Sequence, residues 1–183
     1  MEINVIREII AEIRGGNFQK GRDIILSKYP FQKKEVYNRN YSIKQKMAQF
    51  RKDGFIDRYS GDKLLNPGII KVITYYYPLE FPYHPHWKMT ECHIAYWELT
   101  PSIDHINPIA RGGVDDPCNW VTTSMMNNMI KSNWTLEQIR WQLYPPGNIN
   151  DWDGMTSLFV EMVDNNSELL SDNYIKNWYR QSK

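Results

Sequence analysis

The sequence Ser102-Ile103-Asp104-His105-Ile106-Asn107-Pro108 opens the stretch that decides the expected fold. Residues 101–106 predict a strand, and residues 119–123 predict a second, short strand. Between them, Asn107-Pro108 and Gly112-Gly113 are typical of turns, so residues 107–117 are expected to form a loop. Ser124 is a suitable N-cap for a helix that runs to about Ser132. The stretch therefore predicts an α+β unit in the order strand, loop, strand, helix.

This stretch carries polar side chains that suit a hard metal ion and a general base. Asp104 adjoins His105, and on the predicted helix Asn128 and Lys131 share one face with Ser124. Carboxylate and amide oxygens are ligands for Mg²⁺ or Mn²⁺, and an imidazole can accept a proton near neutral pH. Neighbouring residues on a regular strand point to opposite faces. Asp104 and His105 can therefore meet at one site only if the strand twists or ends there.

The spacing of these residues is specific. The order is Asp-His, asparagine 14 and 23 residues after the histidine, and then lysine. Over residues 96–134 it resembles the HNH nuclease family, in the variant found in RNA-guided CRISPR nucleases. The resemblance implies a ββα-metal fold in which Asp104 and Asn128 hold the metal and His105 is the general base. It also implies that Asn119 braces the loop and orients the histidine, and that Lys131 matches a lysine of the family's helix.

The chain departs from many members of that family in its cysteines. A structural zinc needs four ligands, and the chain has only Cys92 and Cys118, with no CxxC pair. At the start of the helix, Ser124 and Asn127 stand where many members carry a zinc-binding pair. The expected cofactor is therefore Mg²⁺ or Mn²⁺, without structural zinc. In place of zinc, the ββα unit is expected to be stabilised by the side chains of Trp97, Trp120 and Trp134.

The charge distribution indicates a nucleic-acid partner. The net charge of the 183 residues is +1, but residues 1–90 carry 16 basic and 9 acidic residues, a net +7, and residues 91–183 carry 6 and 12, a net −6. Such clustering is typical of a surface that binds nucleic acid. The alternative is a basic face that is only solvated. The predicted contacts with phosphate or DNA are Lys33, Lys34, Arg39, Lys44, Lys46 and Arg51, with Arg111 and Lys131 beside the motif.

The N-terminal region predicts helices at residues 2–14, 20–28, 31–38 and 42–52. Residues 55–59 and 69–75 are expected to form a two-stranded hairpin. Helices followed by a hairpin loosely resemble a winged-helix DNA-binding domain over residues 17–75. The alternative is a small helical domain that packs on the rest of the chain.

The expected domain organisation has four parts. Residues 1–77 form the basic DNA-binding region, and residues 78–90, with Pro78, Pro82 and Pro85, form an extended linker. Residues 91–145 form the nuclease domain, including a helix that starts at Thr135. Residues 146–183 form closing helices over about 154–163 and 167–180. No apolar run reaches the ~18 residues that span a membrane, and the N-terminus lacks a signal-peptide pattern, so a cytoplasmic protein is expected.

Together these observations predict a metal-dependent endonuclease that acts on double-stranded DNA. Within that class, a type II restriction endonuclease is the first choice and a phage or mobile-element homing endonuclease or nickase is the second. Double-strand cleavage with one active site per chain favours a homodimer. An alternative of another class is a DNA-binding regulator whose HNH-like finger is only structural.

Overall fold

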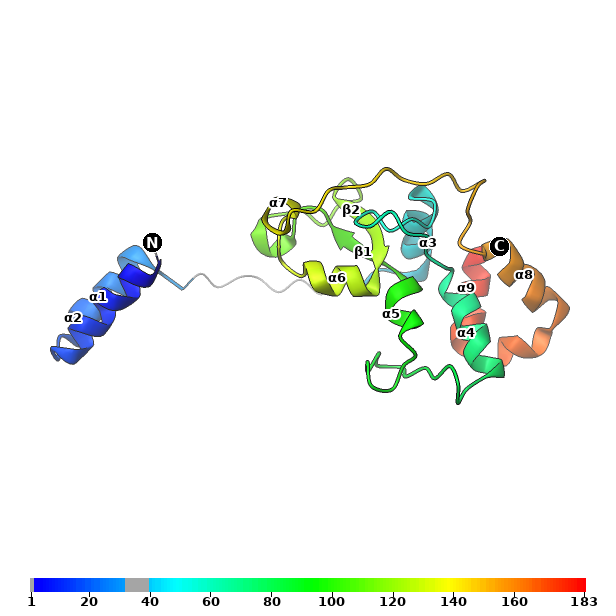
Figure 1. The fold of residues 1–183 in the computed structure, drawn as a ribbon, viewed down its shortest axis with the longest axis horizontal. Helices are drawn as coiled ribbons and strands as arrows, with labels where there is room; N and C mark the ends of the chain where they lie inside the picture. Colours follow the sequence, from blue (N-terminus) through cyan, green and yellow to red (C-terminus); the bar gives the residue numbers. More distant parts are fainter. Residues whose placement is uncertain (1, 32–39) are drawn as a thin grey trace. The chain divides into compact units, whose positions relative to one another are not determined.

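The structure is a computed structural model that describes residues 2–31 and 40–183. The chain divides into two compact units, with the boundary between residues 39 and 40 (Figure 1). The first unit contains α1 (Glu2–Arg14) and α2 (Phe18–Lys28). The elements of the second unit are α3 (Ile43–Lys52), α4 (Pro67–Tyr76), α5 (Ala95–Leu99), β1 (Pro101–His105), η1 (Ile109–Arg111), β2 (Trp120–Ser124), α6 (Met125–Lys131), α7 (Leu136–Ile139), α8 (Thr156–Asn165), η2 (Ser167–Ser171) and α9 (Asn173–Ser182).

The first unit is a pair of helices that pack against each other. The predicted helix at residues 2–14 is confirmed, and it ends where Gly16 adopts a positive φ of 73°. The predicted helix at residues 20–28 is also confirmed, and it begins slightly earlier, at Phe18. Ile9 is buried, whereas Ile6 and Ile13 on the same helix are largely exposed. The helix predicted at residues 31–38 lies almost entirely outside the described residues.

The core of the second unit is built mainly from helices. Phe50 of α3, Ile70 of α4, Phe159 of α8 and Ile175 of α9 are each 0% exposed and belong to one hydrophobic cluster. Figure 1 shows α4, α8 and α9 side by side. The small sheet contributes Ile103 to the same cluster, so the sheet packs against these helices. The unit is therefore α+β, as expected, with one antiparallel two-stranded sheet in the described chain.

The predicted hairpin at residues 55–75 is wrong. Residues 69–75 lie in α4, and the first half of that segment has only an isolated bridge between Ile56 and Lys63. The helix begins here because the Asn66 side chain accepts a hydrogen bond from Gly68 N, and Pro67 stands at a position that favours a helix start. A Cβ at Gly68 would lie 2.3 Å from the Phe159 ring, so α4 packs closely on α8. The described residues therefore lack the hairpin of a winged helix.

The predicted boundary after residue 77 does not match the division of the structure. Residues 40–77 supply α3 and α4, whose apolar faces are part of the core of the second unit. Residues 78–90 form neither helix nor strand, as expected, but they do not separate two domains. Instead, Phe81, Tyr83 and Trp87 pack against the core. In the described ranges, no helix has the length and apolar character needed to cross a membrane.

Candidate functional site

The predicted order of strand, loop, strand and helix is confirmed. β1 pairs antiparallel with β2, with Pro101 opposite Ser124 and His105 opposite Trp120. α6 follows β2 directly, and the Ser124 side chain caps it by accepting a hydrogen bond from Asn127 N. β1 ends at His105, so Asp104 and His105 lie directly before the loop that follows the strand. One small ββα unit thus contains Asp104, His105, Asn119 and Asn128.

Two buried aspartates from another part of the chain hold this unit in place. The Asp57 carboxylate accepts hydrogen bonds from Ser124 N at 2.8 Å and from Asn127 Nδ2 at 2.9 Å. Asp53 accepts one from Thr122 N at 2.7 Å and pairs with Arg58. Ser124 and Asn127 stand where many members of the resembled family carry a zinc-binding pair. Carboxylates thus brace the unit. Of the three tryptophans expected to do so, Trp97 is buried and Trp120 packs against the core, whereas Trp134 is 50% exposed.

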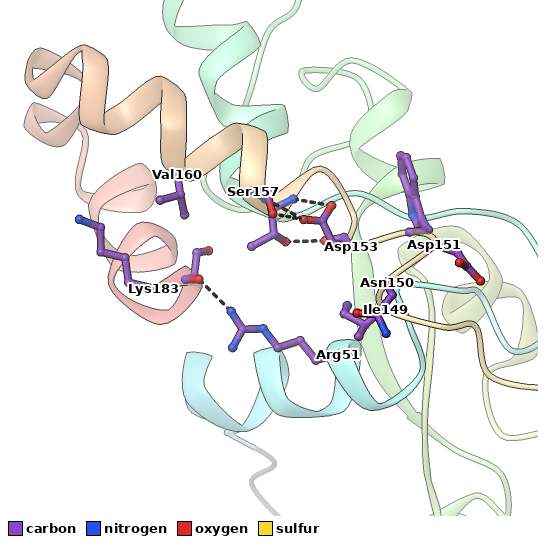
Figure 2. Close-up of a pocket in the computed structure, with 11 residues that line it drawn as sticks. Arg51, Ile149, Asn150, Asp151, Asp153, Ser157, Val160 and Lys183 are labelled. Atoms are coloured by element: carbon purple, nitrogen blue, oxygen red, sulfur yellow. Dashed lines mark hydrogen bonds between the residues drawn. The ribbon is translucent and has the colours of Figure 1, made fainter.

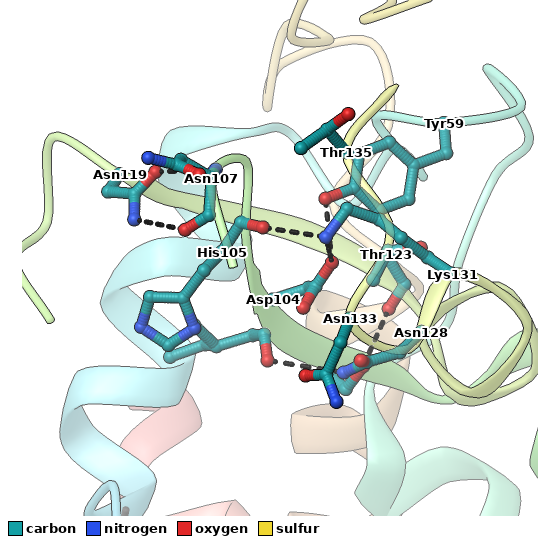
Figure 3. Close-up of polar contacts among 12 residues, drawn as sticks. Tyr59, Asp104, His105, Asn107, Asn119, Thr123, Asn128, Lys131, Asn133 and Thr135 are labelled. Carbon is teal, nitrogen blue, oxygen red and sulfur yellow. Dashed lines mark hydrogen bonds and ion pairs between the residues drawn. The ribbon is translucent and has the colours of Figure 1, made fainter. Parts of the chain in front are cut away.

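Asp104 lies in a buried charge pair. Its Oδ2 atom is 2.8 Å from Lys131 Nζ and accepts a hydrogen bond of 2.7 Å from the Tyr59 hydroxyl (Figure 3). Lys131 is 0% exposed and also donates to the His105 carbonyl oxygen. Burial, together with the Asp104 charge, raises the pKa of Tyr59, which therefore stays a hydrogen-bond donor. The predicted contact between Lys131 and DNA is not supported, because its ammonium group is buried against Asp104.

His105 faces a different group of residues. Its Nε2 atom is 2.9 Å from Asp115 Oδ1 and 3.3 Å from the Tyr41 hydroxyl. Asp115 also accepts hydrogen bonds from Tyr41 and from Trp120 Nε1. Burial raises the pKa of Asp115, but these three hydrogen bonds outweigh it and the net pKa is lowered. A carboxylate only accepts hydrogen bonds, so this contact favours the proton on Nε2 and leaves the Nδ1 lone pair free to accept another.

The structure does not bring Asp104 and His105 into contact. In Figure 3 the His105 ring points away from the Asp104 carboxylate. Among the hydrogen bonds and ion pairs of the described chain, none joins the His105 ring to Asp104 or Asn128. The strand does end at His105, but both residues keep the opposite orientations of a regular strand. His105 is 2% exposed, so the ring is nearly enclosed.

Asn119 closes the loop that follows β1. Its Nδ2 atom donates to the carbonyl oxygens of Asn107 and Val114, and its Oδ1 accepts from Asn107 N (Figure 3). The loop passes so near itself that a Cβ on Gly113 would lie 1.9 Å from the Asn107 oxygen. Only glycine fits there. Asn119 thus ties both ends of the loop together, the bracing role that the resemblance implies.

Asn128 lies on α6 beside the start of β1. Its Nδ2 atom donates to Ser102 Oγ at 3.0 Å and to the Ile103 carbonyl oxygen at 3.3 Å. No hydrogen bond within the described residues uses Asn128 Oδ1 or Asp104 Oδ1. One hard oxygen on each residue is therefore free of protein partners. This donor set fits Mg²⁺ or Mn²⁺, which keep several water ligands in protein sites.

The described part of the chain holds no cluster of three or more histidine, cysteine or acidic side chains that would suit a metal. Cys92 is buried and Cys118 is exposed, and both are free thiols. Asp104 and Asn128 are a pair of another kind, in which one ligand is an amide oxygen.

The other predicted DNA contacts differ in their surroundings. Arg111 is exposed, donates to the Asn133 carbonyl oxygen and lies over the Trp134 ring. Lys44 is exposed, and Lys46 is half-buried. Lys33, Lys34 and Arg39 lie outside the described residues.

Arg51 borders a cavity of about 810 Å³ between α3, the start of α8 and the C-terminus (Figure 2). Its guanidinium group donates to the Ser182 carbonyl oxygen at 2.8 Å. The same cavity carries Asp151, Asp153 and Lys183, and Asp153 is engaged by backbone and hydroxyl groups at the start of α8. Because its charges are mixed, this cavity does not favour an anionic ligand.

Sequence reasoning missed Tyr59, Asp115 and Asp57. Asp115 lies in the loop of the motif, ten residues after His105, so a search of that loop for a carboxylate would have found it. Tyr59 and Asp57 lie far from the motif in sequence, in a segment that was expected to form a strand. Their roles depend on tertiary packing.

Comparisons of the chain with models of known protein families, with curated proteins and with solved structures found no match.

Proposed function

We propose that this chain is a divalent-metal-dependent DNA endonuclease. The observation that carries the proposal is the ββα unit itself. Asp104 and His105 stand at the end of β1, Asn119 closes the loop, and Asn128 follows on the next helix. The order of these residues along a strand, a loop and a helix supports the roles that the HNH resemblance implies. A site-specific enzyme of the type II restriction class is the first choice within this function.

In this proposal Asp104 and Asn128 hold Mg²⁺ or Mn²⁺ through the oxygens that have no protein partner. Such an ion, when bound, stabilises the negative charge that develops on the phosphate and the leaving oxygen. The ammonium group of Lys131 lies 2.8 Å from the same carboxylate and pairs with it. Tyr59 holds the same carboxylate oxygen in position.

His105 accepts the proton of the attacking water at Nδ1, and the contact of Nε2 with Asp115 fixes the tautomer that this requires. The ring is 2% exposed. The proposal therefore requires the loop over residues 107–117 to shift when DNA binds, so that water and the phosphate reach Nδ1. Asn119 anchors that loop at Asn107 and Val114, so the shift must leave these two residues in place or break their hydrogen bonds to Asn119.

The second candidate function is that of a DNA-binding regulator with a structural finger. One observation favours it: the carboxylate of Asp104 is already neutralised by a fully buried lysine, and the histidine is enclosed. A site that only stabilises the fold has these properties. The oxygens of Asp104 and Asn128 without protein partners, and the Asp115–His105 contact, favour the enzyme.

Supercoiled plasmid incubated with Mg²⁺ separates the two functions. The wild type should cut, and His105→Ala should lower the rate by about 100- to 10,000-fold, the usual contribution of a general base. Asp104→Asn keeps an oxygen that accepts from Lys131 and Tyr59 but removes the counter-charge of Lys131, so it should be less stable; where circular dichroism shows it folded, it should bind DNA but not cut. His86→Ala replaces an exposed histidine outside the site and serves as the matched control. DNA binding without cutting by any of the four proteins would support the regulator.

The cut ends of a digested genome distinguish the enzyme classes. A restriction enzyme should leave double-strand ends at one short sequence with two-fold symmetry, because a homodimer presents two equal sites. A homing endonuclease or nickase should leave a long, asymmetric site or a nick in one strand. Supporting data for the dimer would be a sedimentation mass of twice the 21.8 kDa chain.

A further inference from the structure

A second cavity, of about 370 Å³, adjoins the candidate site and is lined by aromatic side chains. Its lining residues come from α3, the start of β1 and α9 within the second unit, together with Tyr41, Trp87 and Met125. Trp87, Tyr174 and Trp178 form much of its wall. Its volume falls within the usual range of small-molecule sites, which is roughly 300–1,000 Å³.

Two residues of the wall carry polar side-chain groups without a hydrogen-bond or ion-pair partner among the described residues. Thr100 is 3% exposed, and its Oγ1 atom has no hydrogen-bond partner in the described chain. A buried hydroxyl left without a partner costs about 1–3 kcal/mol, so such a group is unusual unless a ligand or water completes it. Lys46 is half-buried in the same wall, and none of the ion pairs or hydrogen bonds of the described residues includes its ammonium group. Burial lowers the pKa of its ammonium group, which an anionic partner would counter.

Trp87 gives the wall an unusual backbone. Its φ is 51°, a left-handed conformation that is strained for a bulky residue. The indole is held there by edge-to-face contacts with Tyr96 and Trp97, each with ring centroids 5.8 Å apart. The packing therefore fixes one aromatic surface at the cavity although the local backbone would prefer another conformation.

The cavity is directly connected to the candidate site through two shared residues. Ser102 lines the cavity, and its hydroxyl accepts the hydrogen bond from Asn128. Tyr41 also lines the cavity, and its hydroxyl is 3.3 Å from His105 Nε2. A group bound in the cavity is thus separated from the expected metal ligand by Ser102 and from the expected base by Tyr41.

The ligand that suits these features is flat, aromatic and anionic. Stacking of a nucleobase on an aromatic side chain is worth about 1–3 kcal/mol and tolerates any base. Lys46 can pair with a phosphate, and the Thr100 hydroxyl can bond to the edge of a base. We propose that this cavity binds one unstacked nucleotide of the strand that is cut, adjacent to the scissile phosphate. The assignment to the cut strand rests on the proposed nuclease function.

Equilibrium dialysis with each labelled deoxynucleoside 5′-monophosphate, without metal ion, tests the cavity. The wild type should bind saturably, with inorganic phosphate competing poorly because it cannot stack. Lys46→Met should weaken binding about tenfold, the effect of one charged hydrogen bond, and Thr100→Val should weaken it by about threefold. Lys176→Met is the matched control, because it removes the same charge from α9 without lining the cavity.

Three results of the dialysis would overturn the site. They are the absence of saturable binding up to about 10 mM nucleotide, equal weakening by Lys46→Met and Lys176→Met, and equally strong competition by inorganic phosphate. A nucleotide that binds to the cavity should also inhibit plasmid cutting. Binding without inhibition would refute the assignment to the cut strand and identify a site for a free nucleotide. Dialysis needs no cutting, so failure of the nuclease proposal and failure of the nucleotide site are distinguishable.

Discussion

The two sides of strand β1 differ although their residues are neighbours in sequence. Asp104 faces a fully buried lysine and a buried tyrosine, and its charge is neutralised inside the protein. His105 faces Asp115, whose side chain is 38% exposed and lies in a surface loop. One side is thus part of the core, and the other connects the core to solvent.

This difference separates stability from chemistry. A buried ion pair is strongly destabilised when one partner is removed, because the other is left as an uncompensated charge. A contact with a half-exposed carboxylate contributes little to stability, since water competes for it. We therefore expect substitutions on the Asp104 side to affect folding and substitutions on the Asp115 side to affect mainly the reaction.

The largest expected effect is on the Asp104 side. Asp104→Ala leaves the ammonium group of Lys131 buried without a counter-charge, and the free energy of unfolding should fall by about 3–5 kcal/mol. Urea unfolding followed by tryptophan fluorescence measures this change. The double variant Asp104→Ala, Lys131→Met should recover much of the loss, because no buried charge remains. A loss below about 1 kcal/mol in the single variant would show that the pair is not buried in solution.

An intermediate effect is expected from Asp115 on the rate of cutting. Asp115→Asn removes the carboxylate that selects the tautomer of His105, and kcat should fall about 10- to 100-fold while KM changes little. Asp115→Glu should restore part of the rate. The neighbouring exposed Asp116→Asn is the control, since that carboxylate contacts only Cys118. Equal rates for wild type and Asp115→Asn would remove Asp115 from the mechanism. This prediction rests on the proposed function.

The smallest expected effect is the contribution of Asp115 to stability. Because the pKa of Asp115 is lowered in the folded state, its ionised form stabilises the protein above the unfolded pKa of about 3.9. As pH falls through the lowered folded pKa, this contribution is lost. The free energy of unfolding of the wild type should thus exceed that of Asp115→Asn by at most about 1 kcal/mol near neutral pH. In strong acid the two free energies should be equal. Unfolding curves at several pH values measure the difference. A difference in the free energy of unfolding that grows as the pH falls would contradict the lowered pKa of Asp115.

The local parts of the fold were predictable from the sequence. The spacing of Ile6, Ile9 and Ile13 indicated α1, and Ser124 marked the start of α6. The ββα unit followed from turn residues and short apolar runs. The segment at residues 69–75 was misassigned because a run of β-branched and aromatic residues suits a strand as well as a buried helix. Asn66 and Pro67 were the signals for the helix.

The composition of the site was only partly predictable. The motif itself gave Asp104, His105, Asn119 and Asn128, because all four lie within one continuous stretch. The burial of Lys131 was not predicted, since lysine is rarely fully buried and helix position alone does not show which face is covered. Tyr59 and Asp57 reach the unit from a distant segment, and a single sequence carries no record of which distant segments meet.

The brace at Asp53 and Asp57 determines whether the finger can be transplanted. A zinc finger contains the metal site that stabilises its fold, so it can be moved between proteins as an independent domain. Here the acceptors for the backbone amides of Thr122 and Ser124 come from a loop that lies outside the ββα stretch. A fragment cut at residues 91–145 lacks both acceptors. The finger is therefore a dependent part of its host, and any graft must carry residues 53–59 with it.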